Sequence, residues 1–120
     1  MKILPIFLFI IQALTVRLVA AQDYQAVDFG IRGDGEALNT RSIQAAIDYI
    51  TAKGGGKLIF TPGNYITGSF YLKSNVTLQL DQGANLLGSN NPFDYHKDTV
   101  VNWQSMIYAI RQHNIGIIGK

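Results

Sequence analysis

Apolar and polar residues follow two different periods along this chain. In the first half, apolar residues recur at the i, i+3, i+4, i+7 spacing of a single helical face. Asn39 or Thr40 can cap the start of such a helix, and Gly54-Gly55-Gly56 is a typical stop. The spacing predicts one amphipathic helix from about Thr40 to Ala52. Its apolar stripe consists of Ile43, Ala46, Ile47 and Ile50.

After the glycines the period becomes that of β-strands. Lys57-Leu58-Ile59-Phe60 leads into the turn Thr61-Pro62-Gly63-Asn64, and alternate positions beyond it are apolar or small. Short strands separated by tight polar turns are what a solenoid requires, because each coil buries its apolar side against the next. The positions expected to face inward are Ile66, Gly68, Phe70, Leu72, Val76, Leu78, Leu80, Ala84 and Leu86.

The remaining segments alternate less regularly. Ala26–Gly30 predicts a short strand that ends in a glycine turn, and Arg32-Gly33-Asp34-Gly35 predicts a compact loop. The alternation fails across residues 88–105, which predicts a long loop leaving the coil. Strand character returns at 106–110 and at 115–118.

A weak internal repeat supports the solenoid. Asn75-Val76-Thr77-Leu78 and Asn114-Ile115-Gly116-Ile117 both place an asparagine before alternating apolar residues. Asparagines at such corners can stack as a ladder between coils. Because the sequence to Lys120 reads as a strand and turn still in progress, we expect the chain to be the N-terminal part of a longer solenoid.

The first 21 residues have the composition of a secretory signal. Lys2 precedes an apolar run, and Val19-Ala20-Ala21 offers a cleavage site after Ala21. Gln12 and Arg17 interrupt the run well short of the roughly 20 apolar residues needed for a membrane anchor. We therefore expect a secreted protein, extracellular or periplasmic, with residues 1–21 as signal peptide and 22–120 as the start of one domain.

Removal of this leader changes the charge balance. The whole chain has ten basic and eight acidic residues, but Lys2 and Arg17 leave with the leader, so that residues 22–120 are neutral overall. No basic cluster of the kind that binds nucleic acid is present. The chain has no cysteine, so disulfides cannot stabilise it, and its stability depends on burial of apolar residues.

A set of short stretches carries a resemblance to a known family. These stretches are Val27-Asp28-Phe29-Gly30, Gly33-Asp34-Gly35, Asn39-Thr40, Ile43–Asp48, Gly54-Gly55-Gly56, Pro62–Gly68, Leu72–Leu78 and Gly83–Ser89, followed by Asn114–Gly119. They resemble the motifs of glycoside hydrolase family 28, the polygalacturonases, within the pectate-lyase-like superfamily. Ile31 departs from the small residue usual after Gly30 in that family. The earlier stretches are shared by many secreted and phage β-helix proteins, whereas the later ones are typical of polygalacturonases.

The resemblance implies an all-β fold with one capping helix, the N-terminal coils of a right-handed single-stranded parallel β-helix. It also implies inverting hydrolysis of α-1,4-galacturonosyl bonds in homogalacturonan by a protein that is monomeric when complete, without a cofactor. The aspartate, histidine and Arg-Ile-Lys motifs that carry catalysis in that family are absent from residues 1–120. No catalytic, cofactor or metal residue is therefore assigned, and the chain alone is expected to be inactive.

Two alternatives stay open. A calcium-dependent pectate lyase on the same fold would use an arginine base, and a β-helix adhesin or tailspike module would bind without catalysis. Endo or exo action and the particular pectic substrate are also open.

Several local patterns resemble known binding or modification motifs. Gly30, Gly33 and Gly35 have the order G-x-x-G-x-G, which is not the dinucleotide fingerprint, and Gly56-Lys57 lacks the Ser or Thr of a phosphate loop. Both are interpreted as structural glycines. The sequon Asn75-Val76-Thr77 is likewise interpreted as structural, because it lies at a strand entry.

The loop of residues 88–105 carries the remaining candidate chemistry. Asp94, His96 and Asp98 alternate and could present three metal ligands, although such a set on a polar loop is common by chance. The aromatic residues Tyr95, Trp103 and Tyr108 either line a sugar cleft or anchor the loop to the core. His113 is expected at the surface, before a strand.

Overall fold

The computed structural model describes residues 22–97 and 104–120. The predicted signal peptide lies outside the described residues, as do Asp98 and Trp103. The strands are β1 (Gln22–Gln25), β2 (Asp34–Leu38), β3 (Gly56–Phe60), β4 (Gly63–Thr67), β5 (Phe70–Tyr71), β6 (Val76–Leu80), β7 (Ala84–Gly88), β8 (Ile107–Tyr108) and β9 (Gly116–Gly119). The helices are η1 (Ala26–Phe29), α2 (Thr40–Ala52) and η2 (Pro92–Asp94).

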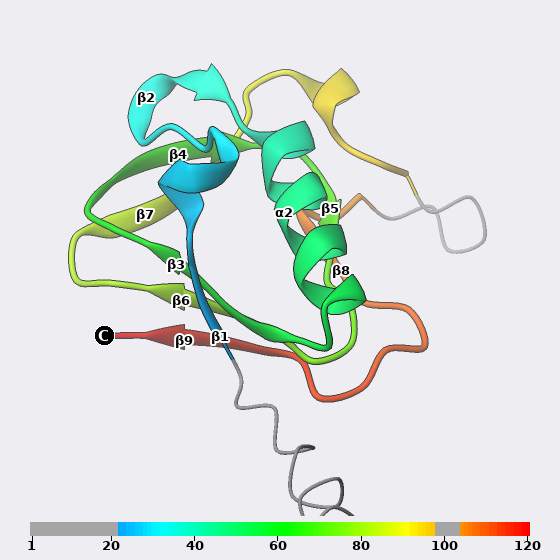
Figure 1. Ribbon diagram of the computed structural model, residues 1–120. Coiled ribbons are helices and arrows are strands. Elements are labelled where there is room, and N and C mark those ends of the chain that lie inside the picture. The colour runs from blue at the N-terminus through cyan, green and yellow to red at the C-terminus, as the bar shows by residue number, and fades with distance from the viewer. Residues whose placement is uncertain (1–21, 98–103) are drawn as a thin grey trace, which may run out of the picture.

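The strands form three parallel sheets, which wind as coils (Figure 1). Their orders are β1-β3-β6-β9, β2-β4-β7 and β5-β8, and all named pairs are parallel. The chain therefore visits the sheets in the sequence β3-β4-β5 and again in the sequence β6-β7-β8, adding one strand to each sheet per turn. This arrangement confirms the predicted fold class, a parallel β-helix with one helix at its start.

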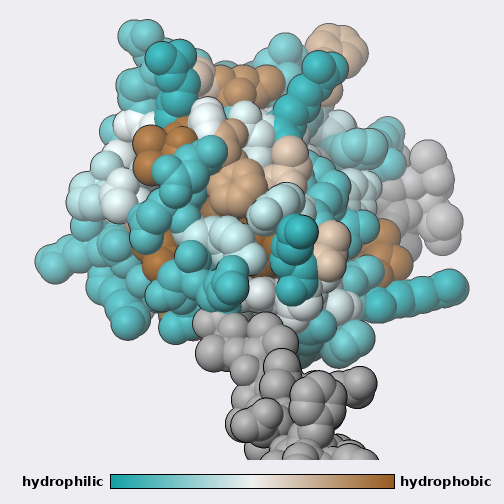
Figure 2. Space-filling model, in the orientation of Figure 1, coloured by the Kyte–Doolittle hydropathy of each residue, from teal (hydrophilic) through white to brown (hydrophobic). Residues whose placement is uncertain are grey.

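Equivalent residues of successive coils stack in the core. Leu58 of β3 is in register with Leu78 of β6, and Leu78 with Ile117 of β9. Leu58 and Leu78 are completely buried, whereas Ile117 is 46% exposed at the last strand. Burial of these stacked residues therefore decreases from the first coil towards the last. On the face shown in Figure 2, apolar side chains form separate patches between polar ones.

Helix α2 has the predicted bounds, Thr40–Ala52. All four residues of its apolar stripe, Ile43, Ala46, Ile47 and Ile50, are fully buried against the first coil. The glycines end the helix as expected, because Gly54 and Gly55 have φ of +101° and +110°. Among the described residues no helix has the length and apolarity needed to span a bilayer.

The expected side-chain cap is not formed. Asn39 occupies the cap position, but its carboxamide accepts from the Arg32 N–H at 2.8 Å and donates to the Arg32 carbonyl at 2.9 Å. Its amide group also reaches the Ile66 carbonyl at 3.2 Å. Asn39 is 1% exposed, so it serves the backbone of neighbouring segments rather than its own helix.

Two predictions before the helix are wrong. Ala26–Gly30 is not a strand, because Ala26–Phe29 forms a turn of 3-10 helix closed by Gly30 at φ +77°. The short strand lies one step earlier, at Gln22–Gln25. The predicted loop, residues 32–35, overlaps the start of strand β2, which pairs with β4 through an irregular register. Its polar sequence has no apolar alternation that would have indicated a strand.

The inward phase predicted for the next strand is also wrong at one position. Tyr65 and Thr67 of β4 are buried, whereas Ile66 is only partly so. The chain turns a corner at Gly68-Ser69, and that corner shifts the alternation before Phe70. Phe70, Leu72, Val76 and Leu78 are buried as predicted, and Leu80, Ala84 and Leu86 are half-buried against the core.

The asparagine ladder is confirmed. Asn114 donates from Nδ2 to Oδ1 of Asn75 at 3.1 Å, and both residues adopt left-handed backbone conformations with φ of 55° and 68°. A second pair, Asn85 to Asn64 at 3.2 Å, joins β7 to β4. The carboxamide of the sequon residue Asn75 is therefore part of a contact between coils, as the structural interpretation predicted.

Candidate functional site

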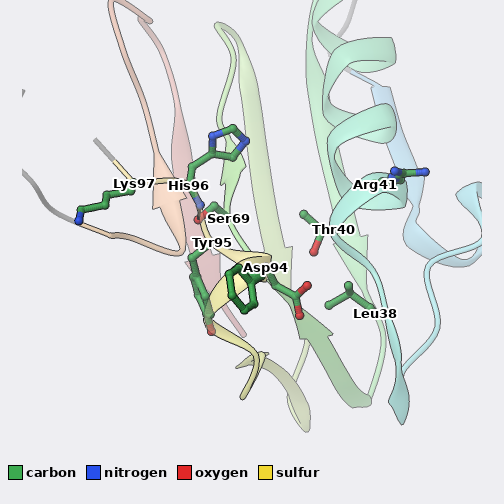
Figure 3. Close-up of a pocket in the computed structure, with 9 residues that line it drawn as sticks. Leu38, Thr40, Arg41, Ser69, Asp94, Tyr95, His96 and Lys97 are labelled. Carbon is green, nitrogen blue, oxygen red and sulfur yellow. Dashed lines mark hydrogen bonds between the residues drawn. The ribbon is translucent and has the colours of Figure 1, made fainter. Parts of the chain in front are cut away.

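A groove runs beside α2, between the helix and the loop that carries residues 93–97 (Figure 3). Its wider part has a volume of about 750 Å³ and its narrower part, along the helix, about 390 Å³. Both parts share Thr40, Arg41, Ser69 and His96, so we treat them as one α2 groove. The other lining residues are Leu38, Gln44, Asp48, Tyr71, Lys73, Phe93, Asp94, Tyr95 and Lys97.

The helix wall of the groove is fixed to the first coil by Gln44. Its Oε1 accepts the backbone N–H of Tyr71 at 2.7 Å, and its Nε2 donates to the Tyr71 carbonyl at 3.1 Å and to Asp48 Oδ1 at 3.0 Å. Thr40 Oγ1 accepts the N–H of Gly68 at 2.7 Å. Side chains of α2 thus form hydrogen bonds with backbone groups that would otherwise pair with a preceding strand.

The loop wall is clamped at the corner of the coil. Ser69 N–H donates to the Asp94 carbonyl at 3.0 Å, and Ser69 Oγ accepts the N–H of His96 at 2.8 Å and donates to the Ser105 carbonyl. A Cβ on Gly68 would lie 1.9 Å from the Asp94 carbonyl oxygen, so only glycine allows this approach. The position of His96 therefore depends on the corner Gly68-Ser69.

Aromatic rings line the narrower part of the groove and support it. Tyr71 stacks on Tyr108 with ring centroids 5.1 Å apart, and His96 meets Tyr71 edge-on at 5.5 Å. The Tyr108 hydroxyl donates to the His96 carbonyl at 2.6 Å. Tyr71 stays half-buried, so one part of its ring is braced and another faces the groove.

Charged groups of both signs border the groove. Arg41, Lys73 and Lys97 form no ion pair or hydrogen bond through their side chains within residues 22–97 and 104–120. The two acids accept hydrogen bonds from neutral groups, Asp48 from Gln44 and Asp94 from the Ser89 hydroxyl. In Figure 3 the Asp94 carboxylate points toward Leu38, while Arg41 and Lys97 lie at opposite sides.

A perturbed carboxyl group lies outside the groove. The pKa of Asp34 lies below its usual value, because the backbone N–H groups of Ala37 and Glu36 donate hydrogen bonds to its Oδ1. The bond from Ala37 has the larger effect. Asp34 is fully exposed at the start of β2 and shapes the turn there. Its shifted pKa therefore reflects local backbone geometry.

The structure places two of the three predicted metal candidates in the groove. Asp94 and His96 both line it, but their side chains point in different directions in Figure 3. Asp98 lies outside the described residues. In the part of the chain that the structure describes, no three His, Cys, Asp or Glu residues lie close enough together to hold a metal ion.

The aromatic candidates divide between the two predicted roles. The Tyr95 hydroxyl donates to the Ser89 carbonyl at 2.7 Å, so Tyr95 anchors the loop while also lining the groove. Tyr108 supports Tyr71 by stacking on its ring. His113 is exposed before β9, as predicted, where its Nδ1 lies 3.3 Å from Ser74 Oγ.

Sequence reasoning missed Arg41, Tyr71 and Lys73 as site residues. Tyr71 and Lys73 are alternate residues of one coil, so both point outward, and Arg41 lies on the polar face of α2. The polar helix face and the i, i+2 pair were visible in the sequence. Their juxtaposition was not, because it depends on how α2 packs against β5.

The comparisons with known proteins connect this fold to polysaccharide-active enzymes. No protein-family model matches the chain. It is 48% identical over 67 residues to an exo-poly-alpha-D-galacturonosidase of Dickeya chrysanthemi, covering 56% of the chain and 11% of that protein. It is 38% identical over 87 residues to a Vitis vinifera protein named as a probable polygalacturonase, covering 68% and 18%.

Solved structures agree with the sequence relatives. A protein of Parabacteroides merdae superposes with a TM-score of 0.77 at 50% identity, covering 82% of this chain and 42% of that one. The family 28 exopolygalacturonase of Yersinia enterocolitica superposes with a TM-score of 0.70 at 37% identity, covering 84% and 20%. The chain belongs to the pectate-lyase-like β-helix superfamily. Its relatives include the galacturonosidase, the probable polygalacturonase and the family 28 exopolygalacturonase named above, and also mannuronan C5-epimerases of Azotobacter vinelandii.

Proposed function

We propose that residues 22–120 form the N-terminal cap and first coils of a secreted, inverting polygalacturonase-type hydrolase, with residues 1–21 as its cleaved signal peptide. The substrate is homogalacturonan, cut at α-1,4-galacturonosyl bonds. The observation that carries this proposal is the 48% identity to an exo-poly-alpha-D-galacturonosidase, combined with the parallel coils. The chain spans 11% of the length of the Dickeya chrysanthemi relative and 18% of the Vitis vinifera relative, so the chemistry is proposed for the whole protein.

The proposed chemistry needs two carboxyl groups on the coils. One protonates the leaving oxygen and the other activates a water, at a separation of roughly 6.5–9.5 Å. Strands of neighbouring coils lie about 4.8 Å apart, so acids one or two coils apart can reach this spacing. We place these acids on coils after Lys120. The groove acids Asp48 and Asp94 are not assigned to catalysis.

The test is expression of the whole reading frame that contains this chain, called here the full-length protein. With polygalacturonate as substrate, we expect new reducing ends and an anomeric product of inverted configuration, followed by NMR. Retention of configuration, or no release of reducing ends, would overturn the proposal.

A second candidate is a β-eliminating lyase of the same fold. The chain is 39% identical over 62 residues to alginate lyase 7 of Azotobacter vinelandii, covering 45% of the chain and 7% of that protein. Elimination leaves a 4,5-unsaturated uronate that absorbs in the ultraviolet, whereas hydrolysis does not. Ultraviolet absorbance that rises with cleavage and disappears with EDTA would favour the calcium-dependent lyase.

A further inference from the structure

The narrower part of the α2 groove brings together groups from two elements. Tyr71 and Lys73 belong to the first coil, and Arg41 and Asp48 belong to the exposed side of α2. Gln44 fixes the distance between the elements, because it bonds to both backbone groups of Tyr71. The groove is therefore held open by hydrogen bonds before any ligand arrives.

The hydrogen bonds of the groove leave its cations available. Asp48 and Asp94 already accept from neutral donors, whereas Arg41 and Lys73 have no acceptor among the described residues. A guanidinium and an ammonium group without partners are the usual means of holding a carboxylate. With Lys97, the groove carries three cations against two acids, which favours an anionic ligand.

The aromatic lining of the groove suits a sugar ring. Tyr71 is braced by Tyr108 on one side and by the edge of His96 on another, so the ring loses little freedom when a ligand contacts it. Aromatic rings pack against the apolar C–H face of a sugar. Asp48 lies along the same wall and can accept hydroxyl groups.

We propose that the α2 groove binds one uronate residue of an acidic polysaccharide, with Arg41 and Lys73 holding the carboxylate and Tyr71 contacting the sugar ring. This inference rests on the proposed function for its substrate class. It gives the cap of the β-helix a binding role apart from the chemistry. The polysaccharide is then held at the start of the coils as well as at the catalytic acids.

The experiment compares two doubly substituted full-length proteins of equal net charge. Arg41→Gln/Lys73→Gln removes the proposed carboxylate contacts, and Lys57→Gln/Lys120→Gln removes two cations that do not line the groove. Binding is measured by affinity electrophoresis in gels that contain polygalacturonate or its fully methyl-esterified form. Unchanged thermal unfolding of both proteins shows that folding is intact.

We expect the groove variant to bind polygalacturonate about tenfold more weakly than the unsubstituted protein, as for loss of charge-assisted contacts. The control variant should retain its affinity, and the methyl ester should not distinguish the variants. Arg41→Lys/Lys73→Arg, which keeps both charges, should restore most of the binding. Tyr71→Leu should weaken binding to both polymers, because the ring contact does not depend on the carboxylate.

Equal binding by the groove and control variants would overturn this inference. If the protein then still hydrolyses polygalacturonate, the proposed function stands without the groove. If hydrolysis is absent but the groove variant loses binding, the proposed function fails while the uronate site stands. Should the glutamine variant not fold, the charge-retaining variant and Tyr71→Leu decide the question by the same gels.

Discussion

The two ends of the coil stack are closed to different degrees. At the start, α2 covers the first coil, and its stripe of Ile43, Ala46, Ile47 and Ile50 is fully buried. At the last strand, β9, Ile117 and Ile118 are 46% and 37% exposed. The first coil is thus covered by a helix, whereas β9 leaves apolar side chains exposed.

The difference teaches how a helix can replace a strand. In β5 and directly after it, the N–H groups of Phe70 and Leu72 donate to the carbonyls of Met106 and Tyr108 in the next coil. The N–H of Tyr71 points the other way, where the described residues supply no preceding strand, and Gln44 of α2 accepts it instead. A single carboxamide therefore does for β5 what strand pairing does elsewhere, and it blocks the edge from further association.

The largest expected effect contrasts buried and open ends with the same substitution. Ile47→Ala should lower the free energy of unfolding by about 2–5 kcal/mol, because it leaves a cavity under the helix. Ile117→Ala, at a side chain that is 46% exposed in β9, should lower it by a similar amount, because the coils proposed after Lys120 cover that side chain in the full-length protein. Denaturant unfolding of the full-length variants measures both. A loss of about 1 kcal/mol or less at Ile47 would contradict a sealed start, and such a loss at Ile117 would contradict coils that continue the stack.

The next effect isolates the carboxamide. Gln44→Leu leaves the N–H and carbonyl of Tyr71 unpartnered on that side and should cost about 1–3 kcal/mol. Gln44→Glu keeps the acceptor but not the donor, so its free energy of unfolding should lie between those of the unsubstituted protein and Gln44→Leu. Gln82→Leu, at an exposed turn position, is the control. If Gln44→Leu unfolds at the same free energy as Gln82→Leu, the claim that Gln44 replaces strand pairing at Tyr71 is contradicted.

A smaller effect concerns the turn that connects α2 to β3. Gly54 and Gly55 both have positive φ, but only at Gly55 would a Cβ approach the Asn75 carbonyl oxygen, at 2.5 Å. Gly55→Ala should therefore be less stable than Gly54→Ala, by about 1–2 kcal/mol. Thermal unfolding of the pair isolates the close approach from the shared backbone strain.

The smallest effect is a pH dependence at the capped end. Because hydrogen bonds from Ala37 and Glu36 lower the pKa of Asp34 in the folded state, its ionised form stabilises that state. This contribution is present above the unfolded pKa and disappears as pH falls through the folded pKa. Asp34→Asn should flatten the acid side of the stability profile slightly, relative to Glu36→Gln. Identical profiles would show that the turn at β2 adds no linked stability.

The sequence predicted those parts of the fold that depend on local periodicity. The helical stripe from Ile43 to Ile50 and the inward alternation from Phe70 to Leu78 are each set by residues close in the chain, and both are confirmed. Strand β2 could not be predicted, because its pairing with β4 depends on backbone contacts and not on an apolar face.

The site was less predictable for the same physical reason. Asp94, His96, Tyr95 and Tyr108 stood out by residue type and do lie at or under the groove. Arg41 and Lys73 are 32 positions apart in the chain and line the same groove only because α2 packs on β5. Gln44 carried no signal of its role, since a glutamine on a polar helix face is ordinarily solvated.

The exchange rate of the Tyr71 amide in the full-length protein tests most directly whether α2 completes the first coil. Native-state hydrogen exchange should show Tyr71 protected to the same degree as Phe70 and Leu72, which bond to the next coil. In Gln44→Leu, protection should fall at Tyr71 far more than at its two neighbours. A Tyr71 amide that already exchanges at the rate of an open chain, with Phe70 and Leu72 protected, would contradict the account.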